Sequence, residues 1–211
     1  MGGETEWKLM REQADLHFQR GNLEQAELFA REAVNEAQAS FGMNHGASAL
    51  SLAKLAFILR LRNKNDEALP VARRAVEVNI RLGGPDHPGT AMALQSEAEI
   101  LFALRKIGEA ETLHRRALAV FQKHYGERSV QTATSLHNVG TMLLAQDKFA
   151  EAEPLLRRAL AVKRQVLKPG HRSIAHTLNN LILVVEARGN KAEAEKFRRE
   201  ARAFASPAPA K

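Results

Sequence analysis

Three of the eight histidines stand at equivalent places in a repeating sequence, and histidine is both a common metal ligand and a common catalytic base. The interval from His45 to His87 is that of the repeat, and His171 follows His87 at twice that interval. Zinc requires its ligand atoms at about 2 Å from the ion, whereas equivalent atoms of neighbouring helices are separated by about 8–10 Å. We therefore expect these histidines to form hydrogen bonds in loops and at helix starts, and not to share a metal ion.

No other set of residues points to catalysis. The chain has no cysteine, which excludes disulfides, thiolate metal sites and a cysteine nucleophile. It contains no glycine-rich phosphate-binding loop and no Gly-x-Ser-x-Gly motif. Nothing in its pattern places serine, histidine and a carboxylate together. The sequence therefore predicts neither an enzyme nor a bound cofactor.

A row of arginines recurs at the same interval and could meet nucleic acid or another anionic partner. A glutamate stands four residues before most of these arginines, in the favourable order for an ion pair along a helix. Only Arg73 lacks such a partner, because Leu69 takes its place. No aromatic residues interleave with the row to stack on bases, so nucleic-acid binding is the least favoured function despite a net charge of +7. The row consists of Arg31, Arg73, Arg115, Arg157 and Arg199.

The recurring histidines and arginines are parts of one repeated sequence unit. The stretch Ile107–Val120, IGEAETLHRRALAV, returns in similar form from Leu23, Asn65, Phe149 and Lys191. A fixed period in this range indicates a solenoid, in which each unit packs mainly on its neighbours. The apolar spacing within each unit predicts two amphipathic helices joined by a tight turn. The alanines that recur at this constant interval are Ala26, Ala68, Ala110, Ala152 and Ala194.

Five such helix pairs account for almost the whole chain. We expect them near residues 5–40, 47–82, 88–124, 130–167 and 172–204, so that residues 1–205 form one array and 206–211 a flexible tail. Small residues should let the two helices of a pair approach closely. Gly140 on a first helix and Ala152 on the following second helix form such a pair of positions.

The small-residue pattern, the helical hairpin and the array resemble tetratricopeptide repeats, whose usual period of about 34 residues is shorter than the roughly 42 residues found here. The longer period is similar to that of kinesin light chains. The loop Leu82–Thr90 resembles that subfamily's Leu-Gly-x-Asp-His-Pro loop, and Ala152–Leu160 and Thr177–Leu181 also match it. The resemblance implies an all-α, right-handed α-solenoid of five helix pairs that makes protein–protein contacts. A chaperone-tail clamp is not expected, because Met92 and Ser96 occupy positions where that clamp needs cations.

The resemblance also implies that the first helices line a concave groove. The inward positions differ between units while the packing positions repeat, so the inward surface is free to specialise. It mixes amides, which pair with a peptide backbone, with apolar side chains that offer pockets, and we expect Phe57, Met92 and Phe102 to be exposed there. We predict that a partner peptide or segment binds to Phe57, Arg60, Met92, Gln95, Glu99, Phe102, Thr134, His137, Asn138, Thr141, His176, Asn179, Asn180 and Leu183.

Self-assembly through the two ends of the array is the alternative function. The first helix is expected to expose Trp7, and the last to expose Phe197 and Phe204, so pairing of ends in a homo-oligomer would bury them. The chain has no apolar run of the roughly 20 residues that a membrane span needs, and its start does not resemble a signal peptide. These features favour a cytoplasmic location.

Overall fold

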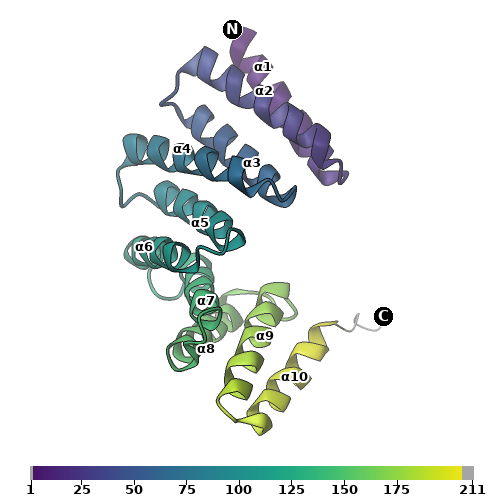
Figure 1. Ribbon diagram of the computed structural model, residues 1–211, viewed down its shortest axis with the longest axis vertical. Helices are drawn as coiled ribbons and strands as arrows, with labels where there is room; N and C mark the ends of the chain where they lie inside the picture. The colour runs from purple at the N-terminus through teal and green to yellow at the C-terminus, as the bar shows by residue number, and fades with distance from the viewer. Residues whose placement is uncertain (1, 206–211) are drawn as a thin grey trace. The chain divides into compact units, whose positions relative to one another are not determined.

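The computed structural model describes residues 2–205, with side chains described up to Arg202. The tail predicted for 206–211 and the side chain of Phe204 lie outside the described residues. Within this range every regular element is a helix (Figure 1), which confirms the predicted all-α class and the five helix pairs. No described helix is both long enough and apolar enough to cross a membrane. The helices are α1 Gly2–Gln19, α2 Leu23–Phe41, α3 Gly46–Leu61, α4 Asn65–Gly83, α5 Pro88–Ala103, α6 Ile107–Tyr125, α7 Val130–Leu144, α8 Phe149–Val166, α9 Arg172–Ala187 and α10 Lys191–Ala205.

The chain divides into two compact units, residues 1–113 and residues 114–211, and the division falls within α6. In the N-terminal unit, the consecutive helices from α1 through α5 pack on one another, and α3 also contacts α5. In the C-terminal unit, α7 to α10 do the same, and α7 also contacts α9. The first helices α3 and α5 are therefore direct neighbours in one unit, and α7 and α9 are direct neighbours in the other. Each unit thus has a surface built from two first helices.

The repeated histidines begin helices. The Nδ1 atom of His45 accepts a hydrogen bond from the backbone N–H of Ala47 at 3.1 Å, and His87 caps α5 in the same way. His171 caps α9 with a bond of 3.1 Å. Each imidazole satisfies one of the N–H groups that a helix start leaves without a partner. The predicted role at helix starts is confirmed.

The tight turn within each pair contains one residue in the left-handed region. Gly21 and Gly189 occupy this position in the first and last pairs, with φ of 75° and 84°. Asn63, Arg105 and Asp147 occupy it in the other three, with φ between 58° and 63°. Glycine adopts this conformation freely, and asparagine and aspartate tolerate it. Arg105 is therefore the strained member of the series.

Replacing Arg105 by glycine is expected to stabilise the protein by about 0.5–1 kcal/mol, because the relief of left-handed strain exceeds the entropy that glycine adds to the unfolded chain. Urea denaturation would measure the difference. Arg105→Ala is the matched control, since it removes the same charge but keeps a Cβ in the strained conformation. If the alanine variant is as stable as the glycine variant, the backbone conformation is not the source of the effect.

Close packing within a pair follows the predicted small residues. An added Cβ on Gly140 would lie 2.7 Å from Cγ of Leu156 and 3.6 Å from the carbonyl oxygen of Ala152, so α7 and α8 meet where α7 has no side chain. Ala152 and Leu156 are both fully buried. The equivalent residues of the second pair are Ala56 and Ala72. A larger residue on the second helix is thus matched by a smaller one on the first.

The expectation that Trp7 and Phe197 are exposed is wrong. Trp7 is 8% exposed, its Nε1–H donates to Ser51 Oγ at 2.8 Å, and its ring meets Phe41 edge to face. Phe197 is 6% exposed and packs into the core cluster of the C-terminal unit. Each ring points toward the helices that pack against its own helix. A helix at the end of the array still has one packed side, and these two rings lie on that side. Self-assembly thereby loses two of the three aromatic residues that motivated it, Trp7 and Phe197.

The last helix, α10, carries arginine at two positions where the preceding second helix carries leucine. Arg198 and Arg202 stand one period after Leu156 and Leu160, and both leucines are buried in the core of the C-terminal unit. At each position a charged side chain thus replaces an apolar one that is buried in the preceding helix pair.

Candidate functional site

The N-terminal unit contains an apolar cavity of about 430 Å³. The two first helices α3 and α5 and the end of the second helix α4 line it. Met92 on its lining is 64% exposed, as expected, and Leu50 and Leu82 are also exposed. Exposed apolar side chains that gather in a hollow are typical of binding sites. Polar groups also line the cavity, at Asn79, Gln95, Ser96 and Glu99.

Phe57 lies beside this face but is not open to it. Its ring packs edge to face on Phe18 at a centroid distance of 5.4 Å, and the guanidinium of Arg60 lies over it. Phe57 and Phe102 are both half-buried, so the expectation that they are exposed is wrong. Phe18 and Arg60 cover Phe57, and a projection of one helix does not include such contacts from neighbouring residues.

Arg60 also forms an ion pair with Glu99 at 3.0 Å, and this pair joins α3 to α5. Desolvation raises the pKa of Glu99, and the charge of Arg60 opposes that rise. Arg60 and Glu99, both predicted to bind a partner, therefore lie together, and each neutralises the charge of the other. A partner segment would meet them as a pair.

The corresponding face of the C-terminal unit is polar. Asn180 on α9 donates from Nδ2 to Thr141 Oγ1 on α7 at 2.7 Å, and the Thr141 hydroxyl donates to the His137 carbonyl at 2.9 Å. The Asn180–Thr141 bond ties α9 to α7, and the side-chain oxygen of Asn180 remains able to accept a hydrogen bond. The other predicted residues on this face are half-buried Thr134 and Asn138, and exposed His176, Asn179 and Leu183.

A buried lysine lies directly behind this face. Lys163 on α8 is 1% exposed, and its Nζ donates to Thr177 Oγ1 at 2.9 Å and to the Ser173 carbonyl at 3.3 Å. Both partners are neutral, so burial lowers the pKa of Lys163 to about 8. An ammonium group buried without a counter-ion is costly to a fold.

Two imidazoles accompany this lysine. His137 Nδ1 lies 3.2 Å from the Thr177 hydroxyl, and burial together with the positive charge of Lys163 lowers the pKa of His137 to about 3. His114 on α6 is fully buried, which lowers its pKa to about 4, and its Nδ1 has no hydrogen-bond partner among the described residues. Both rings are therefore neutral at neutral pH, in a cluster that holds one cation.

Sequence reasoning missed Lys163 and His114. The signal was available in the repeat, because the equivalents of Lys163 in the earlier units are Ala37, Asn79 and Phe121. Ala37 and Phe121 are buried. A lysine at a position that elsewhere belongs to the core indicates a polar cluster.

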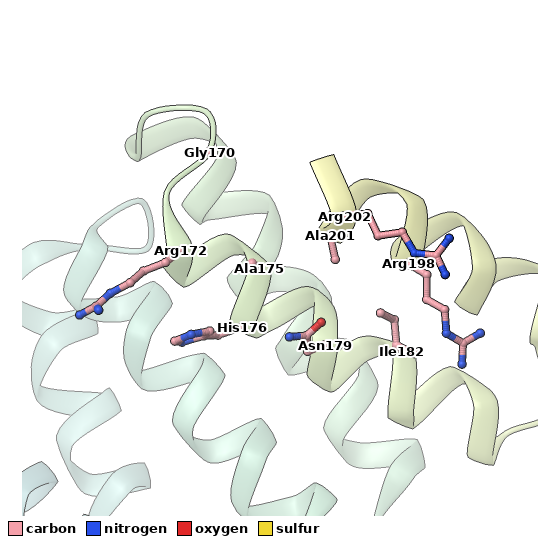
Figure 2. A pocket seen from close by; sticks show the side chains of 9 residues that line it. All are labelled: Gly170, Arg172, Ala175, His176, Asn179, Ile182, Arg198, Ala201 and Arg202. Carbon is pink, nitrogen blue, oxygen red and sulfur yellow. The ribbon is translucent and has the colours of Figure 1, made fainter. Parts of the chain in front are cut away.

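A second cavity, of about 390 Å³, lies between α9 and α10 and includes His176 and Asn179 in its lining. Figure 2 shows Arg172 and His176 reaching from α9 on one side of this cavity, with Arg198 and Arg202 on α10 on the other. No carboxylate is found in its lining, as far as the chain is described. The cavity therefore has a basic rim.

The arginine row on the second helices is neutralised by ion pairs between successive helix pairs. Arg31 reaches Glu67 at 2.6 Å, and Arg157 reaches Glu193 at 2.7 Å. Arg73, which has no glutamate four residues before it, pairs instead with Glu97 at 3.1 Å. Leu69 removes the partner on the same helix, and a carboxylate on α5 replaces it. The positive charge of this row is thereby partly balanced by carboxylates of the same protein.

The comparisons with known proteins agree with this architecture. The tetratricopeptide repeat model matches residues 47–123, 92–165 and 131–206. No curated protein gives a significant sequence match. Among solved structures, a crystal structure of the kinesin light chain nearly identical TPR-like repeats of Podosopora anserina has 20% identity and a TM-score of 0.82, over 97% of this chain and 96% of that one.

Two further structures share the fold. BtubC (BKLC) from P. vanneervenii has 22% identity and a TM-score of 0.81, over 100% of this chain and 96% of that chain. Aspartyl phosphate phosphatase F from Bacillus subtilis has 14% identity and a TM-score of 0.80, over 96% of this chain but 51% of that chain.

Proposed function

The chain belongs to the tetratricopeptide repeat family, and from that premise we propose that it is a non-catalytic interaction module which binds a partner segment on its first helices. The observation that carries the proposal is the apolar cavity between α3 and α5. Repeat proteins of this kind bind their partners along such surfaces. The volume of the cavity between α3 and α5 is within the range of about 300–1,000 Å³ that is usual for ligand pockets.

The chemistry of this cavity suits an apolar side chain of the partner. Met92 and Leu50 stand exposed beside it, and methionine adapts its shape to different apolar groups. Gln95 and Ser96 stand on the same lining with polar groups that can bond to a peptide backbone. An extended segment could therefore place one apolar side chain in the cavity while its backbone bonds to the rim.

The C-terminal unit would bind another part of the same segment or a second one. Asn179 is exposed and Asn138 is half-buried. Each amide offers both a donor and an acceptor, as an extended backbone requires. The role of the amides on α7 and α9 is separable from that of the apolar cavity, because the two features lie in different units.

Replacing Met92 by glutamate should weaken partner binding at least about tenfold, since it places a charge on the lining of the apolar cavity. Wild type and variant would be used as baits in a lysate of the source cell, with retained proteins read by mass spectrometry. Leu28→Glu is the matched control, because Leu28 is an exposed leucine on a second helix. Proteins retained by wild type and Leu28→Glu but lost with Met92→Glu would identify the partner.

The combined change of Asn138, Asn179 and Asn180 to alanine tests the C-terminal face separately. We expect weaker retention of the same partner. Should Met92→Glu and the triple variant both retain every protein that wild type retains, the first helices are not the binding surface.

A further inference from the structure

The two units differ in charge. Residues 1–113 carry 13 lysines and arginines against 16 acidic residues, a formal charge of −3, whereas residues 114–211 carry 18 against 8, a formal charge of +10. The net positive charge of the protein therefore comes entirely from the C-terminal unit. Most of this charge lies on second helices, and several of those arginines are paired with glutamates. The cluster around Lys163 is a different kind of site, because it lies behind first helices.

The repeat relates this cluster to the apolar cavity of the N-terminal unit, because a shift of two periods superimposes α3, α4 and α5 on α7, α8 and α9. Leu50 of the first site corresponds to a threonine in the second, and Met92 corresponds to a histidine. Of the two alanines, Ala53 corresponds to a histidine and Ala93 to a threonine. Asn79 becomes Lys163, and the single acid, Glu99, becomes Leu183. The eight positions Leu50, Ala53, Asn79, Met92, Ala93, Gln95, Ser96 and Glu99 thus correspond to Thr134, His137, Lys163, His176, Thr177, Asn179, Asn180 and Leu183.

The charged and titratable groups around this second site are all bases. His114 faces it from α6, His137 from α7 and His176 from α9, and each of them affects the charge state of the cluster. Arg172 begins α9 and forms no ion pair with a described residue. The nearest acid along α9, Glu186, is bonded to Arg198. Among the described residues the cluster has no carboxylate to balance Lys163.

We propose that the face formed by α7 and α9 binds an anionic group of the partner, a carboxylate or a phosphate. This deepens the proposed function and rests on it. His176, Asn179 and Arg172 would contact the anion from the exposed side. Lys163 acts through Thr177 and His137, and is a positioning and charge-balancing residue because it is too deeply buried to touch the ligand. An anion bound close to this cluster would act as the counter-ion of Lys163, whose hydrogen-bond partners are both neutral.

One further observation supports an anion rather than an apolar group. The basic rim of the neighbouring cavity, at Arg172 and Arg202, extends the positive potential along α9 and α10 (Figure 2). A low-dielectric surround strengthens the attraction of a cation for an approaching anion.

Histidine ring resonances in the NMR spectrum of the whole chain would test the proposal, with glutarate and inorganic phosphate as separate probes. We expect His137 and His176 to shift in a saturable manner, with dissociation constants of about 1–10 mM for such small probes. Lys163→Met should weaken binding at least about tenfold, since it removes the buried cation. His176→Gln, on the exposed side, should weaken it without affecting the core.

Arg164→Gln is the matched control, because it removes one positive charge from the next position of the same helix, where Arg164 pairs with Glu200 on the other side. It should leave the affinity within about twofold of wild type. Equal weakening by Lys163→Met and Arg164→Gln would show an unspecific charge effect and overturn the proposal. Absence of saturable shifts with both probes would also overturn it, whatever the result with Met92→Glu.

The two probes distinguish the source of the anion. Preference for glutarate would indicate acidic side chains or a chain terminus of the partner. Preference for phosphate would indicate a phosphorylated segment. Either result supports an anion site on α7 and α9, and each directs the choice of peptide for the next measurement.

Discussion

Lys163→Met is expected to stabilise the protein by up to about 3 kcal/mol at pH 7, although it removes two hydrogen bonds. The pKa of Lys163 falls from the ordinary value of 10.5 to about 8 on folding, and each unit of such a shift corresponds to about 1.4 kcal/mol. Methionine has a similar length and needs no counter-ion. Thr177 keeps the Ser173 carbonyl as a hydrogen-bond partner in the variant.

The effect should depend on pH in a defined direction. Below pH 8 the lysine is charged in both the folded and the unfolded chain, and the full burial cost is present. Between pH 8 and 10.5 the unfolded chain binds a proton that the folded chain does not, so wild-type stability rises with pH in that window. The free-energy difference between Lys163→Met and wild type should therefore narrow from pH 7 to pH 10.

Urea denaturation at these two pH values would measure the effect, and Arg164→Met is the control. Arg164 is exposed and paired with Glu200, so its replacement should change stability by no more than about 1 kcal/mol, without this pH trend. A Lys163→Met protein that is less stable than wild type at pH 7 would contradict an uncompensated buried charge. A gain in stability with a loss of anion binding would indicate that the lysine is retained for function.

Gly140→Ala and Leu156→Ala should each destabilise the protein but compensate when combined. Leu156→Ala leaves a cavity and should cost about 2–5 kcal/mol. Gly140→Ala places a methyl group against Leu156, and should cost about 1–2 kcal/mol after the gain in helix propensity. In the Leu156→Ala background the same methyl group has room, so it should stabilise by about 1 kcal/mol.

A double-mutant cycle by chemical denaturation measures this reversal as a coupling free energy of about 2 kcal/mol. Ala56→Gly is the matched control, because the facing residue of that pair is the small Ala72. It should cost about 1 kcal/mol from helix propensity. If Gly140→Ala has the same effect with and without Leu156, the two positions do not constrain one another.

Features that depend on residues close together in the chain could be predicted from the sequence. The constant period, the apolar spacing and the turn residues predict helix pairs because each reflects local geometry. The role of His45 and His87 at helix starts follows from the same short-range rules. Recurrent small residues likewise indicate where two helices of one pair approach.

The candidate site could be predicted only as a surface. The first-helix residues that differ between units include exposed Met92 and His176, but the sequence did not reveal that Asn180 bonds Thr141 across α7 and α9. Nor did it reveal that Phe57 is covered by Phe18 and Arg60. These contacts join residues nearly one period apart or depend on rotamers, which a helical projection does not contain.

Tertiary structure alone decided which side chains are buried with which partners. Trp7 is buried through a bond to Ser51, and Arg73 finds Glu97 on the following helix pair. Lys163 is isolated from every described carboxylate although the chain around it is rich in charge. The repeat sets where a helix lies, whereas the cost of burying a charge depends on the few atoms that surround it.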